Sequence, residues 1–248
     1  MKKTSPGGIL QAVRKAVHSE RLLDRHVHLE LTFKEGVLTL EGEVHSVAAK
    51  KLCLERAASV PGVVGIVDRL RVRAATAMHD HTIRSYLLDA LVAEPTLSGV
   101  ELIESENDRM DQVREGDSPD AWIAVQVLNG IVMLDGEVPS LARKRMAGVL
   151  AWWVPGTRDV VNSLRVLPPE RDSDAGLAKV VLAVLEKDPF VDANRVRVAT
   201  KAGGVRLDGV VPTEMERDMA EFDTWCVFGV GAVENHIAVR PTAGRGSS

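Results

Sequence analysis

Two hydrophobic patterns follow one another at the start of the chain. Over residues 10–17 the apolar residues stand three or four positions apart, which gives a helix one apolar stripe. Over residues 27–33 apolar and polar residues alternate, which is typical of a strand with one buried face. The chain is therefore predicted to begin with a helix followed by a strand.

A turn, a second strand, a second helix and a last strand complete this pattern. Lys34-Glu35-Gly36 favours a hairpin turn, because glycine accepts a positive φ. Ser46 stands just after the second strand, where it suits the N-cap of a helix. That helix is expected to end at Pro61-Gly62, and a last strand covers the apolar positions between residues 66 and 72.

The same pattern occurs three times along the chain. The motif Gly-x-x-x-Leu-acidic-Gly-x-Val stands at residues 36–44, 130–138 and 203–211. A second glycine follows the first one by 26 positions in every copy: Gly62, Gly156 and Gly229. Repetition in one register predicts three tandem copies, over residues 7–73, 80–167 and 175–240.

Each copy is predicted to be an α+β unit with the order α-β-β-α-β. Its two helices cover one face of a three-stranded mixed sheet, and the other face stays open. The second helix has a suitable N-cap residue in all three copies: Ser46, Ser140 and Thr213. Units of this size bury a thin core, so we expect packing between the copies to add stability.

The second copy carries an insert. Between Pro95 and Ile123 it has about 21 more residues than the third copy, and residues 100–120 of this stretch are rich in Asp and Glu. Acidic loops of this length are usually solvated and mobile. We therefore expect a mobile loop there, with a cation or partner site as the alternative.

Composition and charge narrow the class of protein. The chain has 248 residues, is 45% hydrophobic and 27% charged, and carries a formal net charge of −4, as in soluble globular proteins. This charge argues against nucleic-acid binding through a broad basic face. No apolar run is long enough to cross a bilayer, and the N-terminus does not resemble a secretory signal, so we expect a cytoplasmic protein. Cys53 and Cys226 are expected to be free thiols.

One repeat position is basic in every copy and lies in the first turn of the second helix. Its residues are Lys50, Lys144 and Arg217, and Lys51, Arg143 and Arg145 stand beside it. A cation at the N-terminal end of a helix gains nothing from the helix dipole, so a basic residue that recurs there in all three copies indicates some other role. With the free backbone N–H groups it forms a candidate site for a phosphate or lipid head group. The alternative is a solvated face whose long side chains pack on the sheet.

Aromatic and polar positions supply further candidates. Trp152 and Trp153 close the second helix of the second copy, and Trp225 matches Trp152 in the third. Such rings suit a membrane interface or a protein contact, or else packing in the core or between the copies.

The last strand of every copy carries an inward polar residue: Asp68, Asn162 and Asn235. Such a residue either satisfies backbone groups or supplies an oxygen ligand to a hard cation. The acidic position of the hairpin motif offers the same two alternatives: Glu41, Asp135 and Asp208.

Transition-metal binding and catalysis find little support in the sequence. His26 and His28, with Glu30 next to them, lie on the open side of a strand, but the other copies do not repeat them. His79-Asp80-His81 lies in a linker. There is no P-loop, dinucleotide-binding fingerprint, nucleophile elbow or two-histidine zinc motif. We expect no metal site, no cofactor and no enzymatic activity.

The hairpin motif, the capped helix and the closing Pro-Gly…Val-x-Asn-x-Leu-x-Val resemble the BON domain, a bacterial family named for osmotically inducible and nodulation proteins. The resemblance covers all three copies, although the third lacks the proline before Gly229. It implies a non-catalytic role in binding phospholipid surfaces, holding envelope proteins in place or sensing potassium.

The first hypothesis is therefore binding to anionic phospholipid in an osmotic-stress context, through the repeated basic position and the tryptophans. The alternatives are a cytosolic sensor of potassium or calcium and a scaffold for a bacterial protein partner. Each assigns the candidate residues a different ligand.

Overall fold

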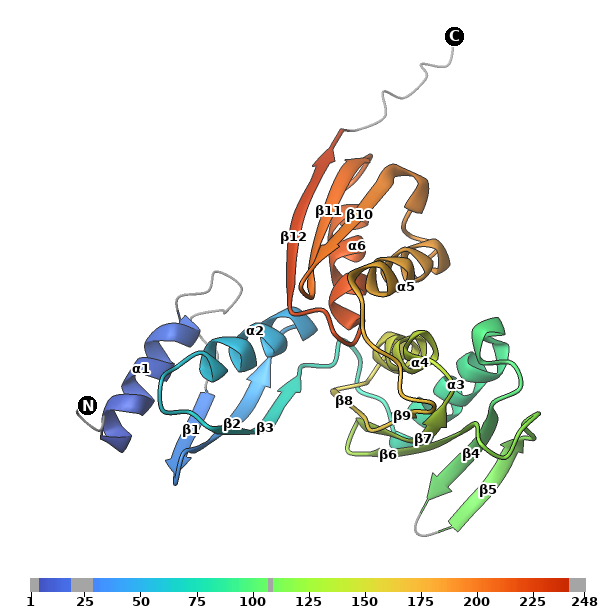
Figure 1. The fold of residues 1–248 in the computed structure, drawn as a ribbon, viewed down its shortest axis with the longest axis horizontal. Coiled ribbons are helices and arrows are strands. Elements are labelled where there is room, and N and C mark those ends of the chain that lie inside the picture. The colour runs from blue at the N-terminus through green and yellow to red at the C-terminus, as the bar shows by residue number, and fades with distance from the viewer. Residues whose placement is uncertain (1–4, 19–28, 107–108, 241–248) are drawn as a thin grey trace. The chain divides into compact units, whose positions relative to one another are not determined.

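The computed structural model describes residues 5–18, 29–106 and 109–240. The chain divides into two compact units, Met1–Ala77 and Met78–Ser248 (Figure 1). The first unit contains the first copy, and the second unit contains the second and third copies.

The first unit has the predicted element order. Its helices are α1 (Pro6–His18) and α2 (Val47–Ala58), and its strands are β1 (Leu29–Lys34), β2 (Val37–Val44) and β3 (Gly65–Val72). The sheet order is β1-β2-β3, with β1 antiparallel and β3 parallel to the central β2. The hairpin turns through Glu35 and Gly36, both with positive φ, as the sequence predicts.

The second copy contains the same five elements with its last strand in two pieces. They are α3 (Asp80–Ala93), β6 (Trp122–Leu128), β7 (Ile131–Val138), α4 (Leu141–Trp153), β8 (Asp159–Asn162) and β9 (Arg165–Val166). The central β7 pairs antiparallel with β6 and parallel with β8 and β9.

The insert of the second copy is a β-hairpin, so the prediction of a mobile loop is wrong. After a short 3-10 turn, Pro95–Leu97, it forms β4 (Glu101–Glu106) and β5 (Arg109–Arg114). β4 pairs in parallel with β6, and β5 lies antiparallel at the edge, which makes the sheet six-stranded. Two of the acidic side chains are paired with α3: the buried Arg84 binds Glu104 at 2.5 Å and Glu106 at 2.8 Å.

The third copy returns to the simple pattern. It consists of α5 (Asp174–Lys187), a 3-10 turn at Ala193–Arg195, β10 (Val196–Lys201), β11 (Gly204–Val211), α6 (Glu214–Cys226) and β12 (Ala232–Val239). Its sheet order is β10-β11-β12, with the same parallel and antiparallel pairing as in the first copy. The α+β fold of repeated units is confirmed.

The repeated sequence motifs have structural explanations. The side chains of Ser46, Ser140 and Thr213 accept a hydrogen bond from the backbone three residues later, so all three are N-caps. The second glycine of the hairpin motif faces the first strand at close range. A Cβ atom at Gly136 would collide with the carbonyl of Trp122, and one at Gly209 with that of Arg195. This glycine therefore permits strand pairing and is not a ligand site.

The second and third copies pack against each other through their helices. α4 of the second copy contacts α5 and α6 of the third, so helices from both copies lie side by side (Figure 1). The sheet of each copy keeps its helices on one face. The other face is open in each copy.

Candidate functional site

The basic repeat position of the first copy is buried. Lys50 is only 6% exposed, and its Nζ lies 2.7 Å from Oδ2 of Asp68 and donates to the carbonyl of Leu70 at 2.6 Å. Asp68 in turn accepts from the backbone N–H of Leu70 at 2.9 Å. The ion pair therefore fastens α2 to β3 within one copy.

In the second copy the same helix turn faces the third copy. Nζ of Lys144 lies 4.7 Å from the ring centroid of Phe228, and burial lowers the pKa of Lys144. Arg145 is 1% exposed, donates through Nε to the carbonyl of Phe228 at 2.9 Å and binds Asp172 at 2.6 Å. These two cations hold α4 to the third copy and to the linker before it.

Arg217 in the third copy is more open, but it also has anionic partners. It lies 2.8 Å from Asp218 and 3.5 Å from Glu214, and its hydrogen bond to Asp218 raises the pKa of Arg217. Lys51 and Arg143 are half-buried. The three equivalent cations thus differ in burial and in partner, and they do not recur as one exposed pattern. Their assignment to a lipid or other anion stays a prediction.

One of the three candidate tryptophans is buried, and the other two are half-buried. The indole N–H of Trp153 donates to Oδ1 of Asp223 in α6 at 2.8 Å, so this residue joins the second and third copies. Trp225 is buried in the third copy, and Trp152 is half-buried. Trp153 therefore occupies a contact between copies, one of the two interpretations that its sequence position allowed.

The polar residues of the last strand link that strand to the second helix. Asn162 donates to the carbonyl of Lys144 at 2.8 Å and accepts from Leu164 N–H at 3.3 Å. Asn235 donates to the carbonyl of Arg217 at 3.2 Å and accepts from Ile237 N–H at 3.1 Å. With the ion pair of Asp68, these bonds satisfy backbone or charged groups in all three copies. A cation at these oxygens stays a prediction.

The remaining polar candidates have local partners or lie outside the described residues. Glu41 pairs with Arg69, Asp135 accepts from Gly136 N–H, and Asp208 binds Arg206 through two hydrogen bonds. Asp80 accepts from Asn129 N–H at 2.7 Å and Gly130 N–H at 2.8 Å, which fixes the start of α3 to the β6–β7 turn. The rings of His79 and His81 stack. His26 and His28 lie outside the described residues. In the described ranges no group of three or more metal-ligating side chains forms.

The open faces of the three sheets carry different kinds of side chain at equivalent positions. The strand registers show which positions correspond. On the second copy this face carries apolar residues: Leu128, Ile131, Met133 and Val161. At the matching positions the third copy has charged or small residues: Lys201, Gly204, Arg206 and Glu234. The first copy has a mixed set: Lys34, Val37, Thr39 and Val67.

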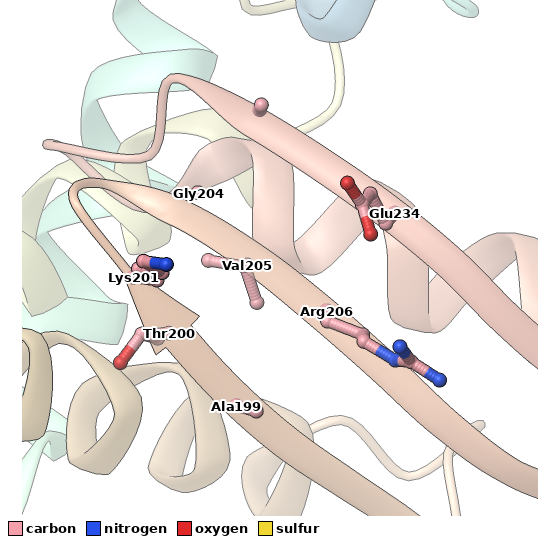
Figure 2. Close-up of a pocket in the computed structure, with 8 residues that line it drawn as sticks. Ala199, Thr200, Lys201, Gly204, Val205, Arg206 and Glu234 are labelled. Atoms are coloured by element: carbon pink, nitrogen blue, oxygen red, sulfur yellow. The ribbon is translucent and has the colours of Figure 1, made fainter.

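The small residues of the third copy leave a shallow hollow of about 340 Å³ on this open face. Ala199 and Gly204 are among the residues that line it; Lys201 lies near the β10–β11 turn and Arg206 farther along β11 (Figure 2). Glu234 lies on the neighbouring β12 (Figure 2). Arg206 is already bound to Asp208, and the positive charge of Lys201 is balanced by the negative charge of Glu234. The hollow therefore has no net preference for an anionic or a cationic ligand.

Sequence reasoning missed a pair of buried carboxyl groups. Asp223 in α6 is 0% exposed, and Asp188 at the end of α5 is also buried. Burial and a hydrogen bond with Asp188 raise the pKa of Asp223 to about 8. The repeat contained a signal that could have revealed Asp223. The second copy has the apolar Leu150 at the same position, which indicates a buried position and makes an aspartate there unusual.

The sequence model of one family, the BON domain, matches three segments of the chain, residues 7–74, 112–168 and 173–241. Osmotically-inducible protein Y of Escherichia coli strain K12 is 31% identical over 124 residues. That alignment covers 48% of this chain and 62% of the relative, less than two thirds of its length.

Among solved structures, the C-terminal domain of CdsD, a structural protein of the type III secretion system of Chlamydia trachomatis, aligns over 94% of this chain and 98% of its own. The identity is 15% and the TM-score is 0.25. In the part of the chain that the structure describes, no helix combines the length and the apolar character needed to cross a membrane.

Proposed function

The chain belongs to the BON domain family, and from this premise we propose that it is a non-enzymatic protein-binding scaffold that acts in a bacterial stress response. The name of the relative, osmotically-inducible protein Y, supports the stress context. The open sheet face of the second copy supports the binding role. A cytoplasmic location stays a prediction from the sequence.

The observation that carries the proposal is the exposed apolar surface on this face, which we call the β6–β8 face. Leu128 is 57% exposed and Val161 is 45% exposed, with Ile131 and Met133 half-buried beside them. The fold does not require apolar residues here, because the third copy has Lys201 and Glu234 at the positions of Leu128 and Val161. Apolar side chains left in water are typical of an interaction surface.

The insert widens the same surface. Ile103 on β4 pairs with Ala124 of β6, and the exposed Met110 on β5 pairs with Ser105 of β4, so both lie on the open side. Asp135 and Glu101 border the apolar side chains. We therefore expect a partner protein with an apolar contact surface and basic residues around it.

Anionic phospholipid and a cation have weaker support as ligands. Lys50 and Arg145 are buried, and the cations of the repeat position already have partners. The oxygens of Asp68, Asn162 and Asn235 accept backbone hydrogen bonds. The acidic border of the β6–β8 face also disfavours an anionic membrane at that surface.

The test compares three forms of the full chain, immobilised and exposed to extract from stressed bacteria. They are the natural chain, a variant with Leu128→Glu and Val161→Glu, and a control with Lys34→Glu and Val67→Glu at the equivalent positions of the first copy. We expect a defined protein to be retained by the natural chain and the control and lost at least tenfold from the variant. Equal retention by all three forms would contradict the proposal, as would retention of no protein by the natural chain.

A further inference from the structure

Two acidic side chains meet inside the third copy, next to the second. Asp223 is fully buried in α6, and Asp188 caps the C-terminal end of α5. The two side chains lie next to each other, because interaction with Asp188 is one of the causes that raise the pKa of Asp223. The Oδ2 atoms of both are buried, and neither has a donor among the described residues when both groups are carboxylates.

A hydrogen bond between two carboxyl groups requires a proton, because ionised carboxylates only accept. The other oxygens are already used. Oδ1 of Asp188 accepts from Phe190 N–H at 2.8 Å, and Oδ1 of Asp223 accepts from the indole of Trp153 at 2.8 Å. One proton between the two remaining oxygens would satisfy both, and it would avoid two adjacent negative charges in a dry site.

We propose that Asp188 and Asp223 share one proton at neutral pH and that losing this proton loosens the junction between the second and third copies. α4 of the second copy packs on both α5 and α6, the helices that carry the two acids. Trp153 of α4 is bonded directly to Asp223. Repulsion between the ionised acids would separate α5 from α6 and admit water where α4 rests on them.

The charged groups near Asp188 and Asp223 are bound to other partners and do not neutralise the negative charge of the pair. Lys187 stands next to Asp188, but its ammonium binds the buried Glu94 at 2.8 Å. Burial acts to raise the pKa of Glu94, yet the hydrogen bonds from Lys187 and Thr96 hold it below its ordinary value.

The other charged groups near α6 are engaged elsewhere. Arg145 of α4 binds Asp172, and Glu216 and Glu221 of α6 accept hydrogen bonds from Asp192 N–H and Asn235. The two strands packed against α6 contribute apolar residues on their helix side, such as Leu207 and Ile237.

The direction of the pH effect follows from the raised pKa. Asp223 titrates at about 8 in the folded protein and at about 4 when unfolded. Between these values the folded chain holds the proton and the unfolded chain does not. The stability of the second unit is therefore expected to fall as the pH rises from about 4 to about 8, and to level off above that.

Tryptophan emission of the full chain, recorded from pH 5 to pH 10, tests the proposal. All four tryptophans lie in the second unit: Trp122, Trp152, Trp153 and Trp225. We expect a change in emission with a midpoint near pH 8. Asp223→Asn should abolish it, and Asp188→Asn should lower the midpoint by about one pH unit because the like charge is gone.

Two further variants make the result specific. Trp153→Phe should lose most of the emission change, while its melting temperature still falls with pH. That fall should extend to a higher pH than in the natural chain, because the indole hydrogen bond lowers the pKa of Asp223. Asp218→Asn, on the exposed side of α6, is the matched control and should behave as the natural chain. The proposal is overturned if the natural chain shows no transition, or if Asp223→Asn keeps it. Should Asp223→Asn fail to fold, an unchanged midpoint in Asp188→Asn would be equally decisive.

Discussion

The first copy and the pair formed by the second and third copies use one basic repeat position in different ways. In the first copy Lys50 turns inward and binds Asp68, eighteen residues later in the same copy. In the second copy Lys144 and its neighbour Arg145 reach Phe228 and Asp172 outside their own fold. The same turn of helix thus stabilises one copy in the first case and joins two copies in the second.

This difference shows that repetition along a sequence need not mean repetition of a binding site. The helix turn recurs because all copies share a fold, whereas the partner of each side chain depends on what surrounds that copy. A neighbouring copy can bury a cation that would otherwise be exposed. Binding is better sought where the copies differ in exposed side chains, as on the open sheet faces.

The largest expected effect is at the junction of the second and third copies. Arg145→Met keeps most of the side-chain volume but removes the bonds to Phe228 and Asp172. We expect the second unit to lose about 3 kcal/mol in its free energy of unfolding, because two hydrogen bonds of a charged group are lost. Urea titration followed by tryptophan emission measures this unit alone, because all tryptophans lie in it.

The control for this variant is Arg143→Met, two positions away and half-exposed. It should change the free energy of unfolding by less than about 0.5 kcal/mol. Equal effects of the two variants would contradict the assignment of Arg145 to the junction.

A smaller effect is expected within the first copy. Asp68→Asn keeps an acceptor for Leu70 N–H but removes the negative charge that lies 2.7 Å from the ammonium of the buried Lys50. We expect a loss of about 2 kcal/mol in the first unit, seen by circular dichroism but not by tryptophan emission.

Adding Lys50→Met to Asp68→Asn should restore at least half of that loss, because the buried positive charge is then removed as well. Glu41→Gln, which breaks the exposed pair with Arg69, should cost less than about 1 kcal/mol. If the double variant were less stable than Asp68→Asn alone, the ion pair would not be the reason for the burial of Lys50.

Much of the fold could be predicted from the sequence because its signals are local. Alternation identifies β1, the repeated glycine motif identifies β7 and β11, and Ser46, Ser140 and Thr213 mark the helix starts through hydrogen bonds only three residues long. The insert could not be predicted in this way. Glu104 and Glu106 suggest a solvated loop, but they pair with Arg84 from the preceding helix, and no periodic pattern encodes that contact.

The candidate sites were harder to predict because their chemistry depends on long-range contacts. Lys50 was assigned to an anion site and Asp68 to a cation site, yet in the fold these two charges neutralise each other. Trp153 and Asp223 form another pair of this kind, from helices in different copies. Residue type and spacing show that such positions are special, and only the fold shows which partner each one has.

The central claim is that the repeated basic position stabilises the fold. Flotation of the full chain with neutral and anionic vesicles, at low and high salt, tests it most directly. The more open members of the basic set are reversed in the comparison variant, Arg143→Glu with Arg217→Glu. We expect no salt-sensitive flotation of either form. Flotation of the natural chain on anionic vesicles that salt weakens and the double reversal abolishes would contradict the account.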